Sequence, residues 1–169
     1  LANVDFREGD AENLPFEDGA FDAVITRLSL HHFADPGRAL AEMRRVLRPG
    51  GRLVVMDVIA DDDPDRAALH NAIEILRDPS HVRMLPAGEL SDLVRAAGLG
   101  IVRVATWEKT REFDEWMGIV NDPTRVEPLR TVVRALAESG RDAGIRLRVD
   151  DAGRIVFFHR WRMVVADRS

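Results

Sequence analysis

Two adjacent histidines, His31 and His32, stand in a polar loop that follows the apolar, β-branched run at 21–26. Histidine ordinarily titrates near pH 6.5, so either side chain could take a proton from an acidic carbon or a hydroxyl group. A packing or capping role suits His31 better, which makes His32 the catalytic candidate. A metal site at His31, His32 and Asp35 is not expected, because adjacent histidine side chains point apart and no fourth ligand is evident.

The carboxylate of Asp10 is the second chemically informative group. It follows a short strand predicted at 4–8, where charged residues alternate along the run. Open α/β folds bind ligands in the crevice at the carboxyl ends of their strands, so Asp10 is a candidate ligand contact. The alternative is that its carboxylate caps the next turn.

Other polar residues fit structural roles. The aspartates at 61–63 suit the start of a helix, where the dipole favours negative charge, better than a metal site. The histidines His70, His81 and His159 are scattered along the chain and are expected to be structural or to face solvent. The sequence therefore predicts no metal site. Four large apolar side chains are expected to pack in the hydrophobic core rather than to form a lid over an apolar substrate: Trp107, Phe113, Trp116 and Met117.

Alternating strands and helices must position these groups. Strands predicted at 21–26 and 53–59 flank a helix that begins at Asp35-Pro36 and ends at Pro49-Gly50-Gly51. This is a βαβ unit, whose crossover should be right-handed. Further helices are predicted at 64–77, 86–97, 113–120 and 127–139, and further strands at 101–107, 146–149 and 155–166.

Composition narrows the class of protein. The chain has 169 residues, of which 46% are hydrophobic and 31% charged, so an ordinary globular domain is expected. Its net charge is −5 and its basic residues are dispersed, which argues against a nucleic-acid partner. There is no cysteine, no apolar run near the roughly 20 residues of a membrane span and no signal peptide, so a cytoplasmic location is expected. Because the first residue is Leu1, a fragment of a longer protein is expected.

Three segments together resemble the class I S-adenosylmethionine-dependent methyltransferases, most closely the quinone-biosynthesis (ubiquinone/menaquinone) type. GDAENLPF at 9–16 resembles the third-strand motif of that family. FDAVITRLSLHHF at 21–33 is similar to its fourth strand and the loop that follows. AEMRRVLRPGG at 41–51, with the strand that begins at Arg52, resembles its next helix, turn and fifth strand.

The resemblance implies S-adenosylmethionine as cofactor and specific roles for residues. Asp10 would accept a hydrogen bond from the adenine amino group, and the backbone N–H of Ala11 would meet a ring nitrogen. Arg27 and Leu28 would face the methionine part of the cofactor. The substrate contacts would be Ser29 and His31, with His32 as a weak base. A carbon or oxygen of a small-molecule acceptor would attack the sulfonium methyl group, so that the protein mainly supplies proximity and orientation.

The implied fold is a Rossmann-like α/β sheet, mostly parallel with an antiparallel last strand. The family order is 3-2-1-4-5-7-6, and residues 1–169 would supply strands 3 to 7 as the C-terminal two-thirds of a single domain. The first two strands would be missing, about 60 residues that include the glycine-rich turn. The strand at 22–26 would then be an exposed edge, which predicts a homodimer or a domain-swapped dimer.

Two alternatives to an active methyltransferase remain open. The first is a truncated, non-catalytic module that serves as a binding or oligomeric unit, which the absence of the glycine-rich turn favours. The second is an NAD-type oxidoreductase. Short-chain dehydrogenase chemistry is disfavoured, because there is no tyrosine and Lys109 is the only lysine.

Overall fold

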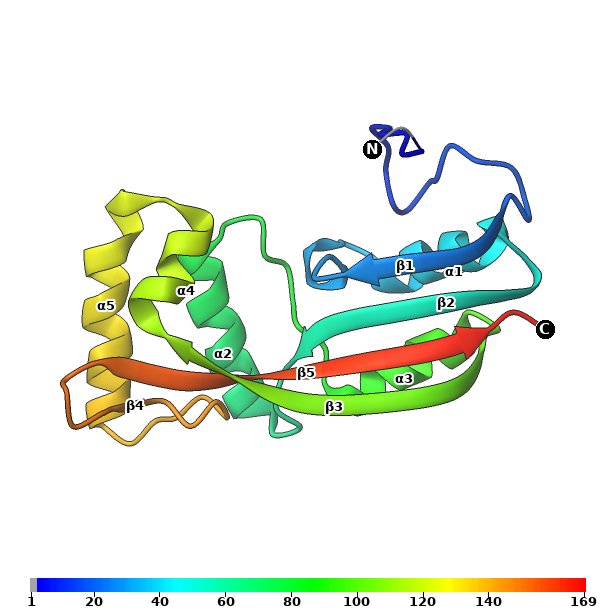
Figure 1. The fold of residues 1–169 in the computed structure, drawn as a ribbon. Helices are drawn as coiled ribbons and strands as arrows, with labels where there is room; N and C mark the ends of the chain where they lie inside the picture. Colours follow the sequence, from blue (N-terminus) through cyan, green and yellow to red (C-terminus); the bar gives the residue numbers. More distant parts are fainter. Residues whose placement is uncertain (1–2) are drawn as a thin grey trace.

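The computed structural model describes residues 3–169 as a long mixed sheet with helices packed along it (Figure 1). Along the chain the elements are β1 (Phe21–Arg27), the 3-10 turn η1 (Leu30–His32), α1 (Pro36–Val46), β2 (Leu47–Ile59), α2 (Pro64–Arg77), α3 (Ala87–Ala96), β3 (Gly100–Glu112), α4 (Phe113–Val120), α5 (Pro123–Glu138), β4 (Arg148–Val149) and β5 (Ile155–Asp167).

The sheet order is β1-β2-β5-β3, and β4 pairs with β5. β1 and β2 are parallel, whereas β5 is antiparallel to β2, β3 and β4. Four strands therefore run in one direction and the last strand runs against them, as predicted. The order also agrees with the 4-5-7-6 part of the family sheet that the resemblance implies.

Asp-Pro pairs begin three of the helices. Asp35 accepts a hydrogen bond from the Arg38 N–H at 2.9 Å, and Pro36 follows as the first residue of α1. Asp63 precedes Pro64 in α2, and Asp122 precedes Pro123 in α5, with the same kind of side-chain cap. The carboxylate satisfies backbone N–H groups that have no partner inside the helix. The 61–63 run is thus a helix start, as predicted.

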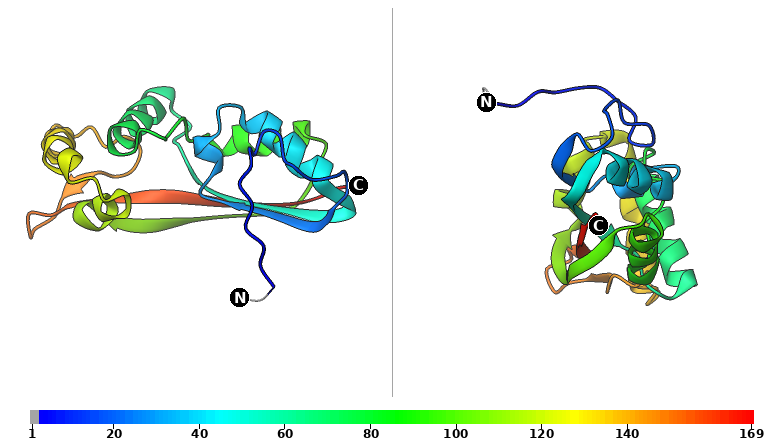
Figure 2. Two further views of the ribbon diagram at one scale, coloured as in Figure 1. Left: turned by 90° about the horizontal axis from the view of Figure 1, so that it is seen from above. Right: turned by 90° about the vertical axis from the view of Figure 1, so that its right-hand side faces the viewer.

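Two hydrophobic cores lie along the sheet, one towards each end. One packs α1 and α3 against β1, β2 and the last residues of β5, around Leu40, Leu53 and Val164. The other packs α2, α4 and α5 against the first part of β5, around Trp116 and Phe157. Figure 2 shows α1 and α3 over one end of the strands and α2 and α5 over the other. Between them a smaller cluster contains Trp161.

The prediction of a strand at 4–8 is wrong. Residues 4–8 form no strand, and the side chain of Phe6 is 91% exposed. Alternating residues favour an extended backbone, but a strand also needs a neighbour for its N–H and C=O groups. No described strand pairs with this segment, which runs away from the sheet (Figure 2).

β1 lies at one edge of the sheet. Within residues 3–169 it pairs with β2 alone, and Ile25 at its centre is 73% exposed. The predicted exposed edge is therefore present. The absence of two further strands remains a prediction.

Candidate functional site

A cavity of about 400 Å³ lies between the two cores. It is formed by the loop after β1, the end of β2, α2 and the loop after it, the end of β3, α4 and β5. Its lining combines apolar and aromatic side chains with histidines and charged groups. Pockets of this size and mixture ordinarily bind small molecules.

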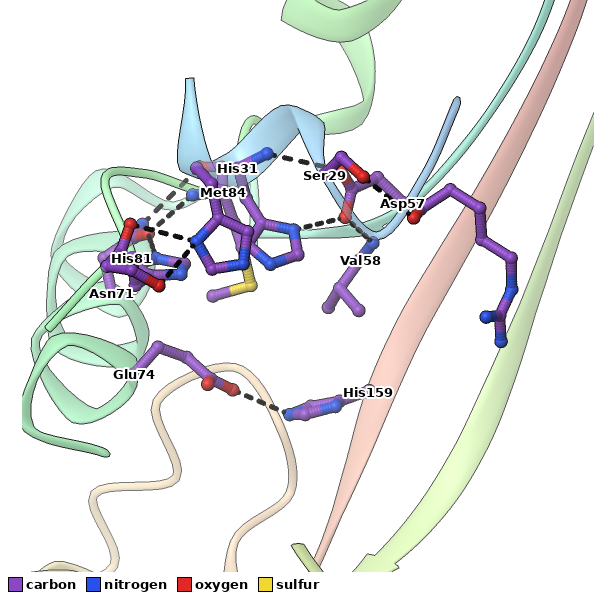
Figure 3. A network of polar contacts seen from close by, with 12 residues as sticks. Ser29, His31, Asp57, Val58, Asn71, Glu74, His81, Met84 and His159 are labelled. Carbon is purple, nitrogen blue, oxygen red and sulfur yellow. Dashed lines mark hydrogen bonds and ion pairs between the residues drawn. The ribbon is translucent and has the colours of Figure 1, made fainter. Parts of the chain in front are cut away.

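The partly buried His31 and the buried Asp57 form a pair in this region (Figure 3). The Nδ1 of His31 lies 2.5 Å from the Oδ1 of Asp57, and the His31 backbone N–H donates to Oδ2 at 3.3 Å. The Val58 N–H donates to Oδ1 at 2.7 Å. Asp57 is 3% exposed, so its charge has little water around it. When His31 is neutral, this contact places the proton on Nδ1 and leaves Nε2 able to accept one.

Strand register brings this pair together. β1 and β2 are parallel neighbours with Arg27 opposite Met56, so the loop after β1 passes the next residue, Asp57. The Leu28 N–H continues the ladder by donating to the Met56 carbonyl at 2.9 Å. Asp57 was not among the predicted site residues. The indication of Asp57 in the sequence was that it is the one carboxylate in the otherwise apolar strand predicted at 53–59.

His32 lines the same cavity but has a different partner. Its Nδ1 lies 2.9 Å from the carbonyl oxygen and 3.1 Å from the hydroxyl of Ser80. The loop after α2 is further attached to η1 because the N–H groups of Val82 and Arg83 both donate to the His31 carbonyl. The structure therefore gives the carboxylate partner to His31, although His32 was the predicted catalytic residue.

The predicted residues after β1 divide into two groups. Leu28 lines the cavity and has a φ of 52°, a backbone conformation that is unfavourable for a residue with a side chain. Arg27 and Ser29 lie outside the cavity wall. The Arg27 guanidinium lies over the ring of Trp161 at 5.5 Å, and the Ser29 hydroxyl donates to the Arg27 carbonyl at 3.0 Å.

Asp10 and Ala11 lie in a turn outside the cavity lining. The Oδ1 of Asp10 accepts the Glu12 N–H at 2.8 Å, which is the capping arrangement weighed above. Glu12 attaches this turn to the start of α1, because its side chain accepts the Asp35 N–H and its carbonyl accepts from Arg38. The turn thus lies near the carboxyl end of β1, where a cofactor crevice is expected.

Three histidines were expected to be structural or to face solvent, and the structure contradicts the second alternative because all three are buried. His70, His81 and His159 are 1%, 7% and 4% exposed, and their rings approach other histidine rings. Burial lowers the pKa of His70 to about 3 and that of His81 to about 4. Sequence distance hid this grouping, since α2 and β5 meet only in the folded chain.

The aromatic group is mainly core, as predicted. Phe113, Trp116 and Met117 are at most 2% exposed, and Trp116 also forms part of the cavity wall. Trp107 differs, because it lies on β3 with 38% exposure and stacks on Trp161 with ring centroids 6.0 Å apart.

Comparison with known proteins shows the family to which this chain is similar. Residues 1–55 match the family model described as "Methyltransferase domain". The chain is 42% identical to the uncharacterized protein YafE of Escherichia coli over 139 residues, which is 82% of this chain and 66% of that protein. It is 34% identical to the uncharacterized methyltransferase YcgJ of Bacillus subtilis over 84% of this chain and 56% of the relative. The solved structure of YcgJ superposes with a TM-score of 0.86 at 30% identity, over 98% of this chain and 71% of that one.

The chain belongs to the class I methyltransferase family. A second structure, protein BH2331 of Bacillus halodurans, superposes with a TM-score of 0.88 at 26% identity over 99% of this chain and 78% of that chain. S-adenosylmethionine is the cofactor of this family. The chain spans 66% and 56% of the lengths of the two curated relatives. Among the described residues, no helix combines the length and apolarity of a membrane span.

Proposed function

We propose that the protein transfers a methyl group from S-adenosylmethionine to a carbon or oxygen of a small-molecule acceptor. The observation that carries this proposal is the His31–Asp57 pair at the carboxyl ends of two parallel strands, beside a cavity of about 400 Å³. Family members that share the fold need a place for an acceptor next to the cofactor. The cavity has the size and the mixed lining that such an acceptor requires.

The residues near the carboxyl end of β1 suit the cofactor. Asp10 supplies a carboxylate for the adenine amino group, and Ala11 supplies a backbone N–H. Arg27 and Leu28 form the loop that would face the methionine part, and the positive φ of Leu28 turns the backbone there. Bound at this edge, S-adenosylmethionine supplies an electrophilic methyl group and a good leaving group.

The chain's own residues orient the acceptor and remove its proton. His31 Nε2 is the proposed proton acceptor, and the buried Asp57 carboxylate stabilises the imidazolium that forms. His32 follows His31 in the chain, lines the same cavity and is proposed to contact substrate. Ser29 precedes η1 outside the cavity wall, so its proposed contact with substrate would be at the cavity's edge. The aromatic and apolar part of the wall, which includes Trp116 and Met84, favours an acceptor with a hydrophobic body.

Relatives support both kinds of acceptor atom. The ubiquinone/menaquinone biosynthesis C-methyltransferase UbiE of Hahella chejuensis is 45% identical over 62 residues, which cover 37% of this chain and 25% of that protein. The O-methyltransferase cnsE of Penicillium expansum is 39% identical over 102 residues, 60% of this chain and 36% of that protein. The first supports an acceptor of quinone-biosynthesis type, and the second supports attack by oxygen.

We also propose that residues 1–169, as an isolated chain, self-associate through β1. The strand has an unpaired edge within the described residues and an exposed Ile25. Exposed edge strands pair readily with a second chain, which supports a homodimer or a swapped dimer.

Calorimetric titration of the full-length protein with S-adenosylmethionine and S-adenosylhomocysteine tests the methyltransferase proposal. Binding of both is expected, followed by transfer of a labelled methyl group to members of a panel of hydroxylated aromatic acceptors. Absence of cofactor binding would contradict the proposal. Binding without transfer to any acceptor would favour the non-catalytic module.

A further inference from the structure

Three buried side chains with metal-binding atoms meet where α2 crosses β5. His70 and Glu74 are four residues apart on α2, so they share one face of the helix. His159 projects from β5 towards them. One ligand atom from each residue lies within 4.8 Å of the other two, and all three residues are buried.

The nitrogens of this cluster lack ordinary hydrogen bonds. The Nε2 of His70 and both ring nitrogens of His159 are buried without a hydrogen-bond partner. The Nε2 of His159 is 3.0 Å from the Oε1 of Glu74, but this contact does not have the direction of a hydrogen bond. Buried polar atoms without partners are costly, so three at one place require an explanation.

A metal ion at the centre would explain two of them, the Nε2 of His70 and one ring nitrogen of His159. Tetrahedral zinc with nitrogen and oxygen ligands near 2.05 Å places neighbouring ligand atoms about 3.4 Å apart. Glu74 Oε1 lies 3.8 Å from His70 Nε2 and 3.0 Å from His159 Nε2, so the observed separations lie on either side of that value. We propose that His70, Glu74 and His159 bind one divalent transition-metal ion of the zinc class.

The surroundings prepare each group for that role. Burial keeps His70 neutral, since its pKa falls to about 3, and its Nε2 lone pair is therefore available. The Glu74 carboxylate is itself buried, with Arg77 against one oxygen and the two imidazoles near the other. Arg77 donates to the other carboxylate oxygen, Oε2, at 3.1 Å, which orients Oε1 towards the imidazoles.

The proposed ion would have an open position towards the cavity. Glu74 and His159 form part of the cavity wall, and Figure 3 shows them on the opposite side from His31 and Asp57. With Glu74 at −1, Arg77 at +1 and the ion at +2, the site would carry a net charge of about +2. This charge favours hydroxide or an anionic oxygen of a bound molecule at the open position.

Metal titration of the metal-free protein, without S-adenosylmethionine, tests this inference separately from methyl transfer. After dialysis against a chelator, Zn²⁺ binding is measured by calorimetry and Co²⁺ binding by visible absorption. One ion per chain is expected, with the intense d–d bands of four-coordinate Co²⁺. Glu74→Gln and His159→Gln are expected to weaken binding about 100-fold or more. His81→Gln is the matched control, because His81 is a buried histidine of the same cavity outside the cluster, and its affinity should equal that of the wild type.

Two results would overturn the proposal. One is wild-type protein that binds neither ion at micromolar concentration. The other is Glu74→Gln protein with the affinity of the His81→Gln control. Because removal of Glu74 leaves the buried Arg77 without its partner, circular dichroism must show that the variant is folded. If the Glu74→Gln variant is not folded, the His70→Asn variant is tested in its place, because it retains the Glu74–Arg77 pair.

Discussion

Replacing Asp57 by Asn tests the proposed catalytic pair most directly. The substitution conserves shape and still allows the side-chain oxygen to accept the Val58 N–H, but it removes the negative charge 2.5 Å from His31 Nδ1. A hydrogen bond to a charged group contributes about 1.5–3 kcal/mol. If that contribution is made only when His31 carries the acceptor's proton, its loss raises the activation barrier by the same amount.

At about 1.36 kcal/mol for each factor of ten in rate, this predicts a kcat lowered about 10- to 150-fold in Asp57→Asn. The affinity for S-adenosylmethionine and the KM of the acceptor should change little, because Asp57 acts through His31. The assay is transfer of a labelled methyl group at saturating cofactor, with calorimetric binding measured on the same samples. Glu89→Gln, which removes a carboxylate from the exposed Arg83–Glu89 pair outside the cavity, is the control.

The reasoning fails if folded Asp57→Asn protein binds the cofactor normally and keeps kcat within about twofold of the wild type. A fall in kcat accompanied by an equal loss of cofactor affinity would also contradict it, since that pattern indicates a disturbed binding site. Thermal unfolding distinguishes both outcomes from loss of the fold.

Three further predictions concern stability, pH and association. Leu40→Ala removes a fully buried side chain of α1 and should lower the free energy of unfolding by about 2–5 kcal/mol in urea titration; a loss below 1 kcal/mol would contradict the packing described. Because burial lowers the pKa of His81 to about 4, the unfolded chain binds the proton more tightly, so stability should fall as the pH drops from about 6.5 to 4. After allowance for solvent screening this loss is up to about 2 kcal/mol, and His81→Gln should reduce it; equal pH dependence in both proteins would refute the assignment. Ile25→Lys places a charge on the exposed edge strand and should shift light scattering towards monomer, whereas a wild-type monomer at micromolar concentration would refute association through β1.

Local sequence patterns predicted most of the elements correctly. α2 was predicted at its observed bounds, and α1, α3, α4 and β5 within a few residues of theirs. These elements depend on nearby signals, such as Asp-Pro at a helix start and apolar residues at helical spacing. The prediction of a strand at 4–8 was wrong. A helix forms its hydrogen bonds among residues close along the chain, whereas a strand needs a partner strand from elsewhere in the chain.

The lengths of the strands also depended on partners from elsewhere in the chain. β3 was predicted at 101–107 but extends through Glu112, since its charged and exposed residues pair with β5 along the whole of that strand. Apolar residues mark only the first part of β3, and its last residues are charged or polar. A long antiparallel partner extends the ladder beyond it.

The candidate site was predictable only in part. The loop after β1, with Leu28, His31 and His32, was recognised, and all three residues line the cavity. Asp57 was missed, because nothing in the sequence shows that it lies beside a residue 26 positions earlier.

The sequence by itself determined the family, the order of most elements and the loop that carries the histidines, because these properties depend on residues that are close along the chain. Tertiary structure decided which polar groups meet. The parallel register of β1 and β2 places His31 against Asp57. The packing of α2 on β5 brings His159 to within 3.0 Å of Glu74 and buries both side chains, which depends on residues from the whole chain.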